Sequence, residues 1–215
     1  MFELILEVAL LLLAAAAAII LHEYAHGWVA YRLGDPTAQL AGRLTLNPLA
    51  HVDPLGTVLV PAMLLLFALL TRVPIIIFGW AKPVPINPLY FRRPYRGMML
   101  VGLAGPLMNL SLAGVGAAIW YPLSHSGQAV PEVLVLFLAI FILINIILAC
   151  YNLIPIPPLD GSRVLAYFLP PRGRLLLRRL EPFGIAAVFG ILFLLWQTDL
   201  VDRLILPLLR WLGLT

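Results

Sequence analysis

The feature that most constrains this chain is a set of apolar runs that match the thickness of a membrane. About 20 apolar residues cross a bilayer core as a helix, and four runs reach that length: residues 5–31, 97–121, 130–152 and 183–211. Over the 215 residues, 62% are hydrophobic and 11% are charged, whereas a soluble domain carries about 25% charged residues. These values exclude an ordinary soluble domain, a disordered chain and a nucleic-acid-binding protein. The sequence predicts a single all-α membrane domain over residues 1–215 with about four full spans.

A fifth apolar segment, residues 54–78, is interrupted by Pro61 and Pro74. If this segment enters and leaves the membrane on one side, all three basic clusters of the chain face the cytoplasm, as the positive-inside rule favours. Arg72 counts against such a re-entrant hairpin, because the tip would carry a charge into the membrane. The segment is therefore predicted to be either a re-entrant hairpin or an extra span. The basic clusters are Arg32 and Arg43; Lys82, Arg92, Arg93 and Arg96; and Arg163, Arg172, Arg174, Arg178 and Arg179.

The most informative motif lies at the end of the first apolar run, where residues 22–26 read H-E-x-x-H. On a helix His22 and His26 share one face, so both imidazoles can bind one metal ion, and Glu23 is placed to act on metal-bound water. The motif follows directly on the continuous apolar residues 8–21, and ionisable side chains in such a place are costly at membrane depth and are functional by default. The alternative is that His22 and Glu23 only mark the water interface. The motif and its setting favour a zinc site with Glu23 as catalytic base.

A hydrolytic zinc site needs a third protein ligand and an open position for water. The single cysteine, Cys150, excludes a cysteine-based site, and His125 is interpreted as a solvated loop residue. Asp160 is the leading candidate, because the proline-broken stretch before it lets the chain unwind and turn the carboxylate inward. Its alternative role is that of N-cap for a short helix at 161–169. His51 is either an extra ligand, a group behind the ligands, a substrate contact or a polar turn residue.

Taken together, these motifs resemble the site-2 protease family of intramembrane zinc metalloproteases, in particular its compact prokaryotic branch. The resemblance covers most of the chain and rests on residues 22–26, 43–54, 79–85, 105–109 and 152–161. It implies one zinc ion per chain, held by His22, His26 and Asp160, with Glu23 as the catalytic base. It also implies that the substrates are transmembrane segments and that Asn152 helps to hold the substrate or the transition state.

Residues 39–46 alternate between two sets of side chains, which is typical of a strand. Peptide bonds in a membrane helix are fully hydrogen-bonded, so a substrate must unwind before it is cleaved. An exposed strand could receive the unwound segment by backbone pairing. The alternative is a small structural hairpin that closes the site. The sequence therefore predicts a small membrane-associated β-hairpin in this region.

Several other polar residues have structural interpretations. Asp53 before a proline is typical of an N-cap, and Asn47 before a proline is typical of a turn. Asn109 is expected to bond a neighbouring helix rather than a substrate. Trp80 and Lys82 fit an interfacial anchor and a functional loop equally well.

The predicted function is zinc-dependent intramembrane endopeptidase activity on transmembrane proteins, as in regulated intramembrane proteolysis. The protein is expected in the cell membrane of a prokaryote, with several passes and the active site towards the cytoplasm. Its expected partners are protein substrates, the bilayer and a regulatory membrane protein, with no nucleic acid. The alternative is a non-proteolytic membrane protein that binds zinc, serves as a scaffold or handles metal. Glu23 argues against that alternative, because metal binding alone does not need it.

Overall fold

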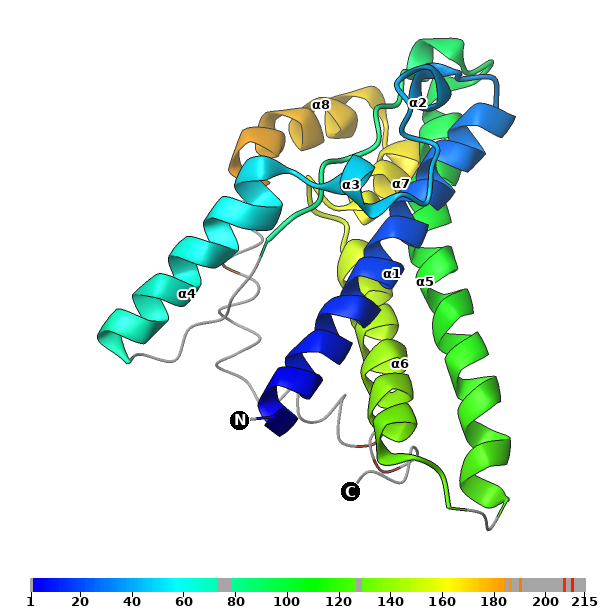
Figure 1. The fold of residues 1–215 in the computed structure, drawn as a ribbon. Helices are drawn as coiled ribbons and strands as arrows, with labels where there is room; N and C mark the ends of the chain where they lie inside the picture. Colours follow the sequence, from blue (N-terminus) through cyan, green and yellow to red (C-terminus); the bar gives the residue numbers. More distant parts are fainter. Residues whose placement is uncertain are drawn as a thin grey trace.

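Three long helices form the centre of the computed structural model (Figure 1). They are α1 (Phe2–Arg32), α5 (Pro94–His125) and α6 (Glu132–Asn152), and each is long and apolar enough to cross a membrane. They coincide with the first three predicted runs, whereas the fourth, at 183–211, lies almost wholly outside the described residues. The all-α class is therefore confirmed for the described part of the chain. The structure describes residues 2–72, 79–126 and 129–184, and the single positions 186, 190, 207 and 210.

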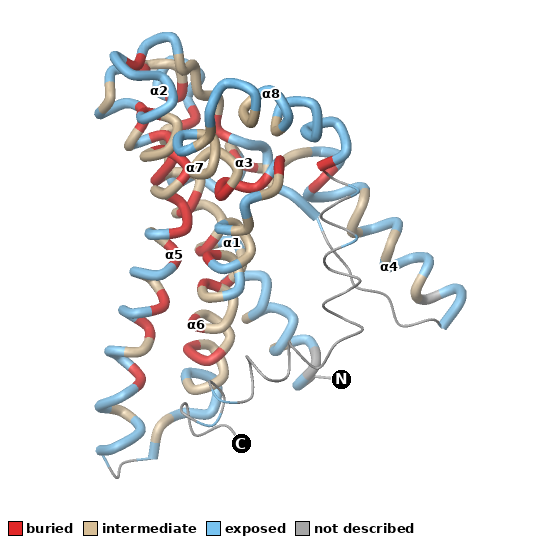
Figure 2. Tube along the Cα trace, turned by 180° about the vertical axis from the view of Figure 1, so that it is seen from behind, coloured by how far each residue is buried: buried red, intermediate tan, exposed pale blue. Residues whose placement is uncertain are grey.

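Small side chains let the three long helices approach each other closely. Ala14 and Ala18 of α1 are fully buried, and a Cβ atom on Gly116 of α5 would lie 2.8 Å from Ile142 Cγ1 of α6. Helices in lipid gain little by hiding apolar side chains from the bilayer, so this close packing holds them together. Large apolar side chains such as Leu12 point outwards instead. Figure 2 shows buried positions recurring along α5 and α6 between exposed ones.

The fifth apolar segment departs from the three-helix bundle, and the chain that follows it lies beside its start. We call residues 54–78 the α4 excursion. It begins with a π-helix, η1 (Pro54–Leu59), and continues as α4 (Val60–Thr71), which stands apart from the three long helices in Figure 1. After the excursion, Trp80 N donates a hydrogen bond to Gly56 O (3.2 Å), and Thr57 Oγ1 donates one to Trp80 O (2.9 Å). The two ends of the segment thus lie side by side. Residues 73–78 lie outside the described part, and the choice between a re-entrant hairpin and an extra span stays a prediction.

The prediction of a strand at residues 39–46 is wrong. A short helix, α2 (Thr37–Leu40), occupies the start of this region, and the Asp35 carboxylate begins it by accepting a hydrogen bond from Thr37 N (3.0 Å). Gly42 then turns the chain with a φ of +64°, and Arg43 N donates back to Ala38 O (2.8 Å). These local bonds consume the backbone groups that a strand needs for pairing. No strand occurs among the residues that the structure describes.

Short helices connect the long ones, and polar side chains cap several of them. Asn47 Oδ1 accepts from Leu49 N (3.1 Å), and Asp53 Oδ1 accepts from Leu55 N (2.9 Å). The predicted turn at Asn47 and N-cap at Asp53 are therefore confirmed. The predicted helix at 161–169 is present one residue earlier, as α7. The remaining elements are α3 (Pro48–His51), η2 (Pro88–Tyr90), α7 (Asp160–Phe168), α8 (Pro171–Leu180) and η3 (Glu181–Phe183).

Two glycines on α5 provide a test of this packing. Gly116→Val inserts a side chain into the contact with Ile142, and overpacking of this kind costs about 1–3 kcal/mol. Gly114→Val makes the same chemical change at a position where an added Cβ has no neighbour within 4 Å. We expect Gly116→Val to melt at a lower temperature in detergent than Gly114→Val. Equal melting temperatures would contradict the proposed α5–α6 contact.

Candidate metal centre

Two helices bring three potential metal ligands to one point. His22 and His26 lie one turn apart on α1, and Asp160 is the first residue of α7. His26 Nε2 lies 3.0 Å from His22 Nε2 and 3.0 Å from Asp160 Oδ2, and His22 Nε2 lies 3.2 Å from the same oxygen. All three side chains are buried. In a tetrahedral zinc site, neighbouring ligand atoms are about 3.3–3.6 Å apart, so small adjustments of this cluster suffice to hold the ion.

Each imidazole is oriented by an oxygen behind it. His22 Nδ1 donates to Asn109 Oδ1 (2.6 Å), and His26 Nδ1 donates to the backbone oxygen of Val101 (2.7 Å). With the proton on Nδ1, the lone pair of each Nε2 is left to face the metal position. Such outer partners fix the tautomer and the ring orientation of metal-binding histidines. The arrangement therefore presents both Nε2 atoms as ligands for one metal ion.

The polar network extends from His22 into the apolar centre of the bundle. Asn109 donates to Asn145 Oδ1 of α6 (2.8 Å) and to Ala18 O of α1 (3.2 Å), and Asn145 donates to Phe141 O (2.8 Å). Both asparagines are fully buried. The expectation that Asn109 bonds a neighbouring helix is confirmed. Sequence analysis missed Asn145, although a single polar residue inside an apolar run is the signal that could have identified it.

Asp160 uses both of its carboxylate oxygens. Oδ2 faces the two imidazoles, and Oδ1 accepts from Arg163 Nη1 (3.1 Å). Burial by itself raises the pKa of Asp160, but the contacts of its carboxylate with His22 and His26 and the nearby charge of Arg163 outweigh this effect and hold the pKa well below its usual range. The group is therefore an anion at neutral pH. The N-cap of α7 is Leu159, with no side-chain cap bond, so the structure does not place Asp160 in the alternative capping role.

Glycine lets α5 lie against the imidazoles. A Cβ atom on Gly105 would lie 2.5 Å from His22 Nε2 and 2.6 Å from His26 Nε2. Real Cβ atoms essentially never come this close. Any larger residue at this position would have to displace the ligand atoms themselves.

Glu23 is half-buried beside the cluster and is held by the chain that returns from the α4 excursion. Its Oε2 accepts a hydrogen bond from Val84 N (3.0 Å). The same stretch is anchored from the other side, where the buried Arg43 donates from Nη2 to the backbone oxygen of Lys82. Lys82 N in turn donates to His51 O (3.0 Å). The carboxylate of Glu23 is thus fixed by residues that are distant in sequence.

Two predicted site residues lie outside the ligand cluster. His51 is buried and its Nε2 donates to Thr45 O (2.9 Å), whereas its Nδ1 has no partner among the residues that the structure describes. Asn152, the last residue of α6, donates to Leu148 O (2.9 Å). Within the described chain, the potential metal-binding group contains only the three ligands named above. His51 in the structure is a buried residue of α3 that supports the returning chain.

Comparisons with known proteins agree with this chemistry. The sequence profile of peptidase family M50 matches residues 121–195. The chain is 37% identical to "Putative zinc metalloprotease YwhC" of Bacillus subtilis over 88% of its own length and 81% of that protein. It is also 31% and 34% identical to proteins of the same description, both named Rip2. The first comes from Mycolicibacterium smegmatis, and the match covers 89% of this chain and 68% of that protein. The second comes from Mycobacterium tuberculosis, and the match covers 81% of this chain and 61% of that protein. No solved structure gives a significant match.

Replacing the carboxylate ligand should release the metal. Asp160→Asn removes the anionic oxygen, and we expect the zinc content per chain in detergent to fall to less than half of that of the wild type. Asp53→Asn makes the same change at a carboxylate that only caps η1, so its zinc content should stay normal. Zinc per chain is measured by mass spectrometry of the purified variants. Full zinc in Asp160→Asn would exclude this residue as a ligand.

Filling the space beside the imidazoles should have the same effect without touching a ligand. In Gly105→Ala, the new methyl group displaces the two Nε2 atoms, and we expect a lower zinc content or faster zinc loss to a chelator. Gly114→Ala on the same helix meets no neighbour within 4 Å and serves as the matched control. If both variants retained zinc equally, the closeness of α5 to the histidines would be disproved.

Proposed function

The chain belongs to peptidase family M50, and on that premise we propose that it is an intramembrane zinc endopeptidase that cleaves transmembrane segments of other proteins. The observation that carries the proposal is the cluster of His22, His26 and Asp160, which lies buried between helices long enough to cross a membrane. A polar cluster in such surroundings is costly and is kept for function. His22, His26 and Asp160 would hold the zinc ion.

The residues around the cluster fit peptide hydrolysis. When bound, zinc polarises a carbonyl and lowers the pKa of its bound water to about 7. Glu23 follows His22 directly, and its Oε2 is fixed by the N–H of Val84. Its carboxylate would accept the proton of the attacking water and pass it to the leaving amine. Asn109 and Val101 keep the two imidazoles in the tautomer that leaves Nε2 free, so these ligands need no rearrangement before reaction.

The distribution of charge supports an active site towards the cytoplasm. Seven of the thirteen arginines lie at the start of α5 (Arg92, Arg93 and Arg96) and in α8, and both regions lie at the same end of the bundle as α7 (Figure 1). The opposite end, where α5 leads to α6, has His125 and no lysine or arginine between residues 97 and 162. The positive-inside rule assigns the arginine-rich end to the cytoplasm. The hydrogen bonds that join the two ends of the α4 excursion support its re-entry on that same side.

The role of Glu23 separates a protease from a protein that only binds or carries metal. Glu23→Gln keeps the shape of the side chain but cannot accept a proton, and loss of general-base action costs about 10²–10⁴-fold in rate. We therefore expect cleavage of candidate single-span membrane proteins to fall by at least about 100-fold while zinc per chain stays normal. Glu132→Gln, at the far end of α6, is the control and should cleave normally.

A metal carrier predicts the opposite result, because its activity does not require a base beside the ligands. Zinc content and cleavage are measured for wild type and both variants in the same detergent. Full cleavage by Glu23→Gln would rule out the proposed mechanism.

A further inference from the structure

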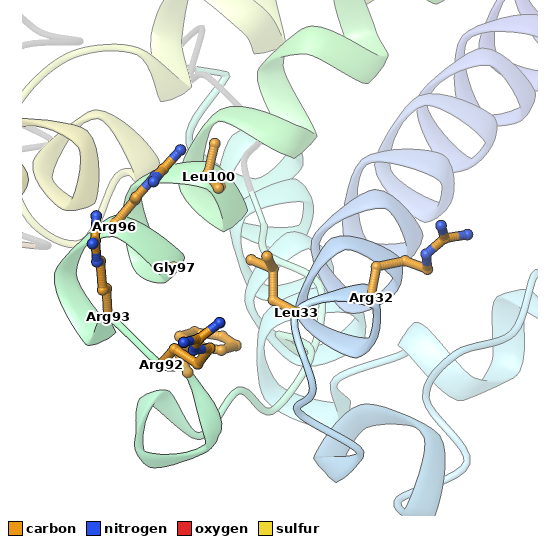
Figure 3. Close-up of a pocket in the computed structure, with 8 residues that line it drawn as sticks. Arg32, Leu33, Arg92, Arg93, Arg96, Gly97 and Leu100 are labelled. Atoms are coloured by element: carbon orange, nitrogen blue, oxygen red, sulfur yellow. The ribbon is translucent and has the colours of Figure 1, made fainter.

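A second site lies where α1 ends and α5 begins, away from the metal ligands. It is a pocket of about 610 Å³, which is within the range of about 300–1,000 Å³ typical of small-molecule sites. Figure 3 shows Arg92, Arg93 and Arg96 on one side of it, and Arg32 with Leu33 from the end of α1 on the other. Four of its eight lining residues are arginines and none is acidic.

These arginines have no anionic partner in the described chain. Every ion pair there involves Asp160, and its arginine is Arg163. The guanidinium of Arg32 lies over the ring of Trp28, 5.3 Å from its centre. Those of Arg92, Arg93 and Arg96 make no hydrogen bond or ion pair with another described residue. The Arg32 side chain points away from the other three in Figure 3. Three exposed guanidinium groups thus lie at the pocket with no acidic side chain among its lining residues, and an anion in the pocket would balance their charge.

The backbone adds to the positive potential. Arg93 is the N-cap of α5, and its side chain makes no cap bond; the first turn holds no acidic residue. The N-terminal end of a helix carries a partial positive charge, so cations there repel the helix dipole and anions are stabilised. Three arginines at the start of a 32-residue helix are therefore unfavourable in the free protein. A bound anion would attract both the arginines and the positive end of the helix dipole, and would so remove their mutual repulsion.

We propose that this pocket binds a phosphate group, and that the phosphate belongs to the headgroup of an anionic phospholipid. Arginine suits this ligand, because its planar guanidinium matches phosphate oxygens with paired hydrogen bonds. Basic pockets between membrane helices on the cytoplasmic side are known to take phospholipid headgroups.

The surroundings of the pocket favour a lipid over a phosphate from solution. Trp28 and Tyr31 are exposed at the same end of α1, as aromatic side chains at a membrane interface commonly are. Apolar side chains complete the lining: Leu33 is partly exposed, and Phe91 belongs to the small core that Ala30 and Val101 form below the pocket. The pocket lining thus combines basic and apolar side chains, as a headgroup and the start of an acyl chain require.

The position of the pocket links it to the metal centre. The pocket joins the last turn of α1 to the first turns of α5, and the next residue of α5 after the pocket-lining Leu100 is Val101, whose oxygen orients His26. A headgroup held by both helices would oppose their separation at this point. We therefore expect a bound lipid also to slow the loss of zinc.

The test uses a matched pair of double variants in the full-length protein. Arg92→Gln/Arg96→Gln removes two charges from the pocket, and Arg178→Gln/Arg179→Gln removes two from α8, at the same end of the bundle but outside the pocket. Short-chain phosphatidylglycerol is titrated into each protein in neutral detergent, with short-chain phosphatidylcholine and glycerol 1-phosphate as the other ligands. Binding is followed by native mass spectrometry and by the melting temperature, and zinc per chain shows whether each variant is folded.

We expect the wild type and the α8 variant to bind phosphatidylglycerol with similar affinity. The pocket variant should bind about 25-fold more weakly, at about fivefold for each arginine. Equal weakening in both variants would mean attraction to a basic surface only and would overturn the site. Equally tight binding of glycerol 1-phosphate, or of phosphatidylcholine, would overturn the assignment to an anionic lipid. None of these measurements depends on proteolysis, so the lipid site is tested independently of the proposed enzyme activity.

Discussion

The contact between two imidazoles and one carboxylate is the interaction on which the arrangement of the helices depends. His22, His26 and Asp160 are buried among apolar helices, where an unpaired polar or charged group costs several kcal/mol. Each therefore has to find its partners inside the protein. His22 is hydrogen-bonded to Asn109 and His26 to the backbone oxygen of Val101, and both imidazoles contact the carboxylate of Asp160. These bonds determine which faces of α1, α5 and α7 meet, and at what height along the bundle.

Close helix packing makes this contact possible, because the ligands have little room. Gly105 brings the backbone of α5 against the two imidazoles, and Gly102 faces the backbone oxygen of Asp160, 3.0 Å from where its Cβ would lie. Behind them, Asn109 and Asn145 tie α5 to both α1 and α6. Both asparagines are fully buried, and their amide groups are hydrogen-bonded. Such a framework holds ligands in place before the metal arrives, which limits the reorganisation needed during catalysis.

The catalytic base depends on a different part of the chain. Glu23 lies beside the ligands on α1, but the group that fixes its carboxylate, Val84 N, comes from the stretch that follows the α4 excursion. That stretch is positioned by Arg43 and by the backbone of His51. The region predicted as a β-hairpin, either receiving substrate or closing the site, thus has another structural role. Its turns and caps close on themselves and support the residues around Glu23.

The sequence by itself determined the class of the protein and the composition of its site. Apolar runs about 20 residues long leave few options besides membrane helices, and the i, i+4 spacing of His22 and His26 places them on one helix face whatever the tertiary fold. Residues 39–46 were predicted wrongly, because alternation over eight residues also arises where Asp35 begins a helix and Gly42 ends it. Asn145 was missed, although its place inside an apolar run is a signal of function. Gly105 and Val84 lie in segments that carry the resemblance, but their roles were not identified, because these roles exist only through contacts between distant segments. Sequence periodicity records which face of an element is buried, but only the tertiary structure decides which groups meet across that face.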